Sequence, residues 1–274
     1  MKQWFLLIIL SLLAGHVYAQ TFQWANNYGG KATDQGYAIT TEKNGNSYFT
    51  GSNFSSSLIV GDDTLKGSDL VVGKVNSKGK AIWGYSANQI GAVSGCDGND
   101  IVYKDSFIYV VGTFNGRVDF QKKDTLSSTS FGSALFLLKM DTSGQVQWAE
   151  KIDTTGDVEG RCVVVNQNRI VIGGIKGQSH LVATYNHNGQ LTWSQTSASK
   201  FTPSLGYTNG TEDIAITGKG TIVYVGVFTD SLTFNNKTLK CNSFSCGFVA
   251  RYDSSNTLQL LAKANSGIDA VIYR

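Results

Sequence analysis

A pattern anchored on tryptophan recurs along this 274-residue sequence and restricts the folds that the chain can adopt. Trp24, Trp83, Trp148 and Trp193 stand in similar surroundings, and Leu261 takes the corresponding place in a further copy. The shortest step, from Trp148 to Trp193, is about 45 residues. Self-similarity at such a period indicates a repeat architecture built from small supersecondary units.

Four short segments recur in a fixed order around these anchors. The first is a strand that follows acidic or small residues, and the second is a β-branched or aromatic strand that ends in glycine. The third is an apolar strand that leads into a turn, and the fourth strand carries the tryptophan. The first strands begin near Asp34, Asp97, Glu159 and Glu212, the second strands end at Gly51, Gly112, Gly173 and Gly226, and the third strands span 70–74, 135–139, 181–184 and 248–251.

The turns between the third and fourth strands have the chemistry of β-hairpins. Each opens with Asn or Asp, which hydrogen-bonds the turn's backbone, and closes with Gly or Asn, which takes a positive φ at low cost. These turns are 76–79, 141–144, 186–189 and 253–256. Three copies also carry a hairpin between the second and third strands, at 58–65, 118–126 and 232–239, which the third copy lacks.

Such a unit needs neighbours on both sides. Four antiparallel strands leave two apolar faces and two edges, and radial stacking buries both faces with tryptophan as a large contact residue. A solenoid would have shorter coils, and an immunoglobulin-like sandwich would have modules of ~100 residues. The sequence therefore predicts an all-β fold, a β-propeller-type array of four-stranded antiparallel blades. The repeats fall at approximately 25–84, 85–149, 150–194 and 195–262.

The repeat is out of phase at both ends. Residues 22–24 read as a fourth-type strand without the first three, and residues 267–273 read as the opening strand of a fifth copy within 263–274. We therefore expect four full blades with a stray strand at each end, in an incomplete array that belongs to a longer protein. A four-bladed ring with loose ends is the alternative.

The first 19 residues are typical of a cleavable export signal. Lys2 precedes an apolar run that is too short to span roughly 30 Å of hydrocarbon, and residues 17–19 supply small residues for signal peptidase. Residues 20–274 then form the mature repeat domain, which we expect to be secreted or to lie on the outer surface of a Gram-negative-type bacterium. No second apolar stretch follows, so we expect no membrane insertion of the mature chain. The balance of 23 basic against 20 acidic residues gives no indication of a nucleic-acid partner.

Four cysteines fit an oxidising compartment. Cys241 and Cys246 enclose a short segment and can close it as a disulfide. Cys96 and Cys162 lie near the start of equivalent strands in consecutive copies, where they can approach each other or remain two buried thiols. A zinc site is the weaker alternative, because the sequence has neither CxxC spacing nor a flanking histidine.

Acidic residues near the first strands are the most interesting polar set, since the innermost strands of a propeller line its axis. These acids are Asp34, Asp97, Asp100, Glu159, Asp213 and Asp269. A ring of Asp34, Asp100, Asp213 and Asp269 could hold Ca²⁺, which prefers several oxygen ligands. We favour the alternative that each acid accepts backbone hydrogen bonds in its own turn. A glycosidase pair is also conceivable, but recurrence in every repeat favours a structural role.

The two histidines beyond the export signal are weak candidates for chemistry. His187 lies inside a hairpin turn and His180 at the entry to a strand, and no Ser–His–Asp set or metal-ligand set surrounds them in the sequence. We therefore assign no catalytic, cofactor-binding or metal-binding residue beyond the possible acidic ring.

The chain resembles the bacterial β-propeller repeats (SBBP-like) of secreted and surface proteins. The family pattern has an acidic residue, Gly-Asn-x-Tyr-x-x-Gly, a Phe-containing hairpin, an apolar strand that ends in Lys, and a Gly followed by Trp. The first copy matches it at Asp34, 45–51, 70–74, Gly79 and Trp83. The third copy lacks the hairpin and the Lys, and the fourth lacks the Trp and the turn Gly. The resemblance covers nearly all of the mature chain and implies a scaffold for adhesion or recognition, with no catalytic set.

Three functions follow as hypotheses. The leading one is a non-catalytic scaffold that recognises an unknown protein or glycan. The second is a carbohydrate-active propeller enzyme with its site in the axial channel. The third is a structural spacer of a larger surface protein.

Overall fold

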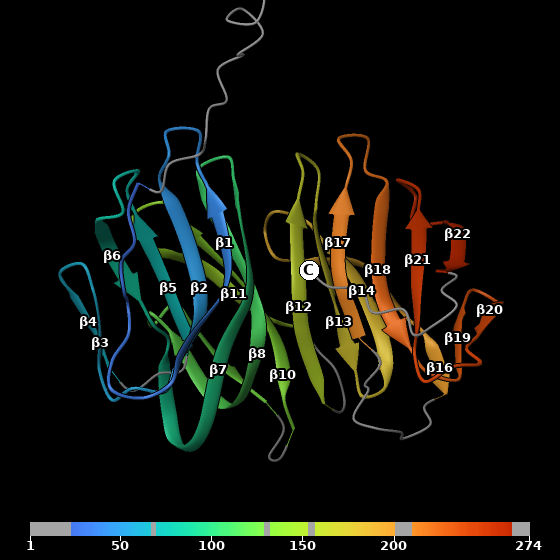
Figure 1. Ribbon diagram of the computed structural model, residues 1–274, viewed down its shortest axis with the longest axis horizontal. Coiled ribbons are helices and arrows are strands. Elements are labelled where there is room, and N and C mark those ends of the chain that lie inside the picture. The colour runs from blue at the N-terminus through green and yellow to red at the C-terminus, as the bar shows by residue number, and fades with distance from the viewer. Residues whose placement is uncertain (1–22, 67–69, 129–131, 153–156, 201–209, 265–274) are drawn as a thin grey trace, which may run out of the picture.

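The computed structural model describes residues 23–66, 70–128, 132–152, 157–200 and 210–264, and their regular structure consists of strands (Figure 1). Four antiparallel sheets follow one another along the chain, each with a path of four strands. The predicted fold class is therefore confirmed: the chain is an all-β, propeller-type array of four full blades. No helix in the described ranges is long and apolar enough to cross a membrane.

Each blade runs from its first to its last strand in chain order. The first comprises β1 (Asp34–Thr41), β2 (Ser47–Asn53), β5 (Leu70–Val75) and β6 (Ala81–Tyr85), and the second β7 (Asn88–Lys104), β8 (Phe107–Phe120), β10 (Ala134–Asp141) and β11 (Val146–Ile152). The third comprises β12 (Val158–Val165), β13 (Ile170–Lys176), β14 (Ser179–Tyr185) and β15 (Leu191–Thr196), and the fourth β17 (Gly210–Ile216), β18 (Ile222–Phe228), β21 (Cys246–Tyr252) and β22 (Leu258–Lys263).

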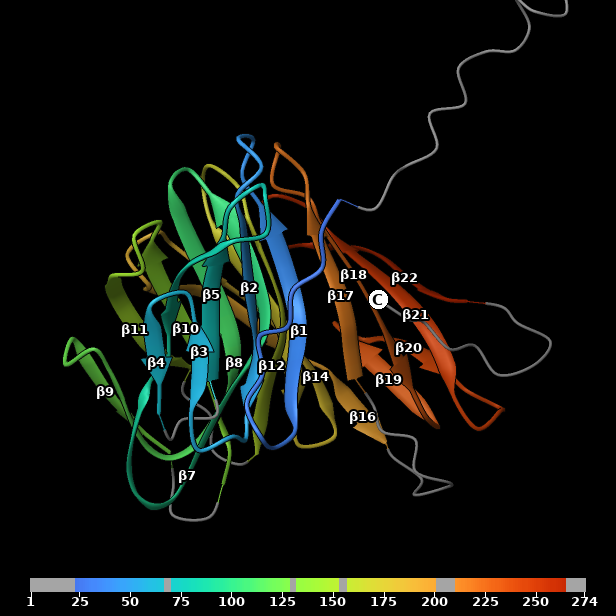
Figure 2. The same ribbon diagram turned by 60° about the vertical axis from the view of Figure 1, so that its left-hand side comes forward.

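The additional hairpins lie where the sequence places them, outside the third blade. In the first blade β3 (Leu58–Val60) pairs with β4 (Asp63–Leu65), and in the second β8 pairs with β9 (Asp124–Ser127). In the fourth, β16 (Ala198–Lys200), β19 (Ser231–Phe234) and β20 (Lys237–Lys240) form a small sheet. Figure 2 shows β9 at the outer edge of the second blade.

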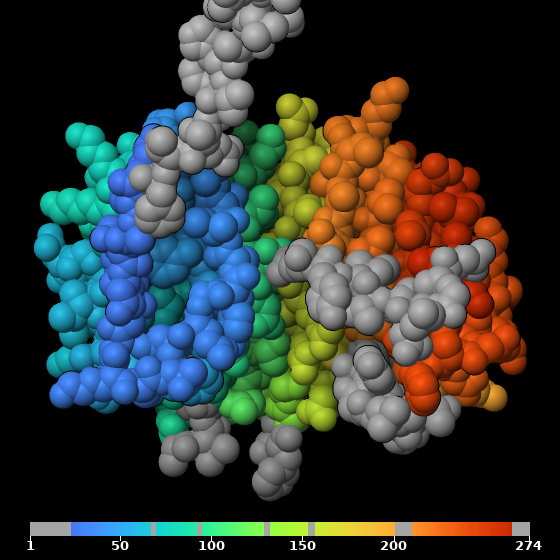
Figure 3. All heavy atoms as spheres, viewed as in Figure 1, coloured from blue at the N-terminus to red at the C-terminus, as the bar shows by residue number. Residues whose placement is uncertain are grey.

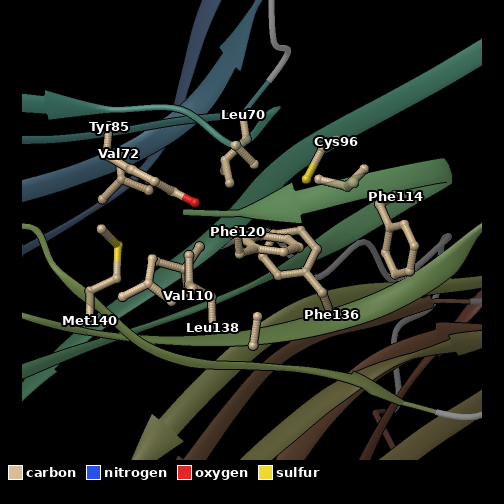
Figure 4. Packing of buried hydrophobic residues seen from close by; sticks show 14 of the residues in the cluster. Leu70, Val72, Tyr85, Cys96, Val110, Phe114, Phe120, Phe136, Leu138 and Met140 are labelled. Carbon is tan, nitrogen blue, oxygen red and sulfur yellow. The ribbon is translucent and has the colours of Figure 1, made fainter. Parts of the chain in front are cut away.

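The core consists of the layers between successive blades. Along the second and third strands, alternate side chains point to opposite faces of the sheet. We call the face toward the preceding blade the leading face and the opposite one the trailing face. Leu70 and Val72 on the trailing face of the first blade share one cluster with Val110 and Leu138 on the leading face of the second (Figure 4). Equivalent clusters join the second blade to the third and the third to the fourth.

The repeated Trp and Lys connect each of the first two blades to the turn of the next blade. The indole Nε1 of Trp83 donates a 3.1 Å hydrogen bond to the carbonyl oxygen of Thr142, and Lys74 Nζ donates one of 3.2 Å to the same oxygen. In the second blade, Lys139 Nζ donates a hydrogen bond to the carbonyl oxygen of His187, which is the second residue of its turn, as Thr142 is of the preceding one. The Trp therefore recurs because the facing turn offers both a carbonyl and a glycine surface.

The register corrects two of the equivalences inferred from the sequence. Lys74 faces Trp83, and in the fourth blade Arg251 faces Leu260, so Leu260 and not Leu261 takes the tryptophan position. In the third blade the glycine equivalent to Gly51 is Gly174, one residue after Gly173. Both shifts escape a search for motifs because neighbouring residues of the same kind compete for the alignment.

The predicted N-terminal strand is also wrong over its described part, because Gln23 and Trp24 are not in a strand. Trp24 nonetheless packs like the tryptophan of a preceding blade. Its Nε1 donates a 3.2 Å hydrogen bond to the carbonyl oxygen of Ser77, and a Cβ on Gly79 would overlap its ring. The export signal at 1–19 and the predicted strand at 267–273 lie outside the described residues.

The first strands of the blades are the innermost. β7 packs against β1 and β12, and β12 packs against β17, so that β1, β7, β12 and β17 lie side by side across the front of Figure 1. β17 and β1 do not pack against each other in the way these neighbours do. The space-filling view shows the middle blades, in green and yellow, between the first blade in blue and the fourth in orange (Figure 3). Within the described residues the four blades therefore form an arc, with the first and fourth blades at its two ends.

Candidate functional site

A β-bulge recurs at one position of every innermost strand. The register shifts by one residue between Gly36 and Ala38, between Gly98 and Asp100, between Gly160 and Cys162, and between Thr211 and Asp213. A bulge re-aims the side chain of the extra residue and bends its strand. The four extra residues are Tyr37, Asn99, Arg161 and Glu212.

The glycines that end the second strands make this bulge possible. A Cβ on Gly51 would overlap the carbonyl oxygen of Gln35, two residues before the bulge residue Tyr37. Gly112, Gly174 and Gly226 have the same relation to the carbonyl oxygens of the first strands that they face. The glycine in the repeat thus marks a close approach of two backbones, and it fixes where the bulge residue emerges.

The bulge residues of all four blades line one cavity. Its volume is about 240 Å³, and its lining residues are Tyr37, Asn99, Arg161, Thr211 and Glu212. Because the backbone position is the same in each blade, the chemistry of the cavity depends on which side chain each bulge carries. Here these are an aromatic ring, an amide, a guanidinium and a carboxylate. We call this set the bulge cavity.

An ion-pair network occupies one side of the bulge cavity. Arg161 Nη2 lies 3.2 Å from Glu159 Oε2, and Arg161 Nη1 lies 3.5 Å from Glu212 Oε1 on the next blade. The Arg161 side chain keeps 26% of its surface exposed. Asn99 Nδ2 donates a 2.6 Å hydrogen bond to the carbonyl oxygen of Gly160. The guanidinium is therefore oriented in advance by its two carboxylates, as a ligand-binding group should be.

Tyr37 forms the aromatic part of the cavity. Its side chain is 43% exposed, and its hydroxyl donates a 2.6 Å hydrogen bond to Gln35 Oε1. One ring edge is thereby fixed while the rest of the ring remains accessible. An accessible, oriented aromatic ring beside hydrogen-bonding groups is the usual makeup of a site for a polar ligand.

Within the described ranges, no group of three or more His, Cys, Asp or Glu side chains is placed to hold a metal ion, and this includes Asp34, Asp100 and Asp213 of the proposed acidic ring. Asp34 lies three residues before its bulge, whereas Asp100 and Asp213 directly follow theirs. Asp269 lies outside the described residues. Asp97 Oδ1 accepts a hydrogen bond from Ser52, and Glu159 pairs with Arg161.

These acids accept backbone hydrogen bonds instead. Asp34 accepts the N–H groups of Gly30, Phe54 and Ser55; burial alone would raise its pKa, but these bonds hold it below the usual value. Asp100 Oδ2 accepts the N–H of Val163 at 2.7 Å, and Asp213 Oδ1 accepts the N–H of Ile214 at 2.8 Å.

Neither histidine lies in the bulge cavity. His180 is fully buried, its ring meets Phe248 edge-on with centroids 4.7 Å apart, and its Nδ1 lies 3.4 Å from Thr211 Oγ1. Burial, followed by the charge of Arg161, lowers its pKa to about 3. His187 lies in its turn, with Nδ1 3.2 Å from the hydroxyl of Tyr109.

Cys241 and Cys246 form a disulfide in the structure, and Phe244 on the loop between them is 53% exposed. Cys96 and Cys162 are buried in different inter-blade clusters as thiols. The second pair is thus not cross-linked.

Glu159 and Glu212 are the two carboxylates of the bulge region that contact Arg161. Glycosidases leave the space between their two carboxyl groups open for the scissile bond. Here the guanidinium of Arg161 occupies the space between Glu159 and Glu212.

Sequence reasoning missed three of the bulge residues. It pointed to the right strands and included Glu212 as a strand start, but it selected acids and not Tyr37, Asn99 and Arg161. The available signal was the pairing of a glycine in the first strand with the glycine that ends the second, which recurs in three of the four blades.

No protein-family model and no curated protein matches this sequence. A crystal structure of a protein from Lactobacillus plantarum is similar at 12% identity and a TM-score of 0.36, with 85% of each chain covered. The structure of the Dos1 propeller is similar at 10% identity and a TM-score of 0.38, with 86% of this chain and 63% of that chain covered. The description as a propeller-type array therefore rests on the four blades themselves.

Proposed function

We propose that this protein is an exported, non-catalytic recognition scaffold, placed outside the cell or on its outer surface, and that it binds a saccharide in the bulge cavity. The observation that carries this proposal is that one backbone device presents four chemically different side chains to a single cavity. A purely structural spacer has no need of such variation at equivalent positions. The resemblance to repeats of bacterial surface proteins supports the location.

A saccharide fits the chemistry of this cavity better than a strongly charged ligand. Arg161 is balanced by Glu159 and Glu212, so the network offers paired donors and acceptors without a large excess of either charge. Tyr37 offers a ring against which an apolar sugar face can stack. A volume of about 240 Å³ lies below the ~300–1,000 Å³ of pockets for drug-sized ligands, which suits a single ring or a chain end.

The proposal is tested by screening the purified protein on an array of defined mono- and oligosaccharides and measuring each hit by calorimetry. We expect Tyr37→Ala and Arg161→Ala each to weaken binding by at least about 10-fold. The first variant removes the ring on which the sugar stacks, and the second removes a charge-assisted hydrogen bond. The matched control is Ile59→Ala, which removes an exposed side chain on β3. Absence of any saccharide hit, or equal binding by the cavity variants and the control, would contradict the proposal.

A further inference from the structure

We propose that two copies of this chain close into one ring, with the trailing face of the fourth blade of each copy packed on the leading face of the first blade of the other. Two observations carry this proposal independently of any ligand. One apolar position on each end face is less buried than its equivalents, since Ile39 is exposed and Val249 is only partly buried. In addition, Trp24 already supplies the tryptophan that the fourth blade lacks.

The leading face of the first blade carries the clearer of the two signals. Two residues after each bulge stands an apolar residue that faces the preceding blade. Ile101, Val163 and Ile214 are 4%, 2% and 4% exposed at this position, whereas Ile39 is 64% exposed. A cavity of about 360 Å³ opens beside Ile39 and Phe49 on the same face. An exposed apolar surface of this kind marks an interaction site.

The trailing face of the fourth blade also carries apolar residues that are less buried than their equivalents in the other blades. On the third strand, Val72, Leu137 and Val182 are fully buried at equivalent positions, but Val249 is only partly buried. Val223 and Val225 on the adjacent strand share this face and this partial exposure. Since every inter-blade layer joins a trailing face to a leading face, the two end faces of the arc are complementary in kind.

Trp24 and Leu260 fit this junction. Between successive blades, the tryptophan of the earlier blade packs on the turn glycine of the next blade, as Trp83 does on Gly144. On the first blade that place, beside Gly79, is filled by Trp24 of the same chain. The fourth blade correspondingly carries Leu260 where a second indole would collide with Trp24.

A polar contact is also available at this junction. Asp100, directly after the second bulge, reaches the N–H of Val163 on the next blade. Asp213 directly follows the fourth bulge, and the position equivalent to Val163 in the second copy is Ile39. In the proposed ring, the Asp213 carboxylate of one copy therefore faces the backbone of Ile39 of the other copy, whose exposed side chain the junction would bury. A second copy is the occupant that carries all of these complementary features.

The test is the mass of the purified protein in solution, measured by sedimentation across a dilution series. We expect twice the monomer mass for the wild-type protein. Ile39→Asp should raise the dimer dissociation constant at least about 100-fold, because it places an unpaired carboxylate in the junction. The matched control is Leu191→Asp: Leu191 is 55% exposed but lies on β15 of the third blade, which is not an end blade, and the dimer of this variant should persist.

A mixing experiment distinguishes this ring from other dimers. Ile39→Asp and Val249→Asp proteins should each be monomeric, yet their mixture should form a dimer through the one junction that keeps both wild-type faces. Circular dichroism confirms that each variant is folded. A wild-type monomer at every concentration overturns the proposal. So does a dimer that Ile39→Asp breaks and Val249→Asp leaves intact, which would mean that two leading faces meet. Saccharide binding is measured separately, so its outcome does not affect this one.

Discussion

The side chain of Asp100 on β7 accepts a 2.7 Å hydrogen bond from the backbone N–H of Val163 on β12, and so joins the second blade to the third next to the bulge cavity. This contact gives one acidic residue of the repeat a structural role. Asp100→Ala should lower the free energy of unfolding by about 1–3 kcal/mol, because it leaves a backbone donor at the inter-blade layer without its acceptor. Asp100→Asn keeps an oxygen acceptor and should lose less. Urea denaturation of the three proteins measures the difference, and equal stability of the alanine variant and wild type would contradict this role.

Gly51 and Gly36 face each other across β1 and β2 and permit a matched test of the bulge geometry. A Cβ on Gly51 would overlap the carbonyl oxygen of Gln35, whereas a Cβ on Gly36 would have no atom within 4 Å. Gly51→Ala should therefore destabilise the protein by about 1–3 kcal/mol, and Gly36→Ala should change its stability by less than about 0.5 kcal/mol. The urea midpoints of the two variants test this, and similar midpoints would mean that the bulge does not depend on Gly51.

Most of the fold could be predicted from the sequence, because each strand type has its own local signal. Alternating apolar residues, a glycine at the end of the second strand and an Asx-to-Gly turn recur in the same order, and the strands follow them. The turn residues are the most reliable part, since Gly79 and Gly144 adopt the positive φ for which the turn selects glycine.

The site could be predicted less well, because it depends on register. Asp34 and Asp100 both stand near the start of a first strand, yet one precedes its bulge by three residues and the other directly follows its own. A one-residue insertion in the ladder is set by backbone contact with the facing glycine, which is not visible in either strand alone. The assignment of Leu261 to the tryptophan position of the fourth blade was wrong for a similar reason. Only the pairing of Arg251 with Leu260 distinguishes between the two adjacent leucines.

The disulfide between Cys241 and Cys246 closes a short loop at a sequence separation of 5. In the chain-entropy model a loop of this size stabilises the fold by about 2 kcal/mol, because little entropy is removed from so short a segment of the unfolded chain. The double variant Cys241→Ser, Cys246→Ser should lose about this amount in urea denaturation. Added reductant should destabilise the wild type and leave the double variant unchanged; equal sensitivity of both proteins would show that another site responds to reductant.

His180 should make the stability of the protein dependent on pH. Burial, with a further contribution from the charge of Arg161, lowers its pKa to about 3, against about 6.5 in the unfolded chain. Above about pH 6.5 the ring is neutral in both states and its contribution is constant. As the pH falls from about 6.5 toward 3, the unfolded chain binds a proton that the folded one does not. Stability should therefore fall by up to about 1.4 kcal/mol per pH unit in this window.

His180→Gln isolates this effect, since glutamine keeps hydrogen-bonding capacity but does not titrate between pH 3 and 7. The carboxylates contribute equally to both proteins, so the difference between their free energies of unfolding reports the histidine alone. We expect that difference to change steadily between about pH 6.5 and 4 and to be flat above pH 7. A difference that is independent of pH throughout would mean that the ring is protonated as readily in the folded protein as in the unfolded chain, and that it is therefore not buried beside Phe248 in solution.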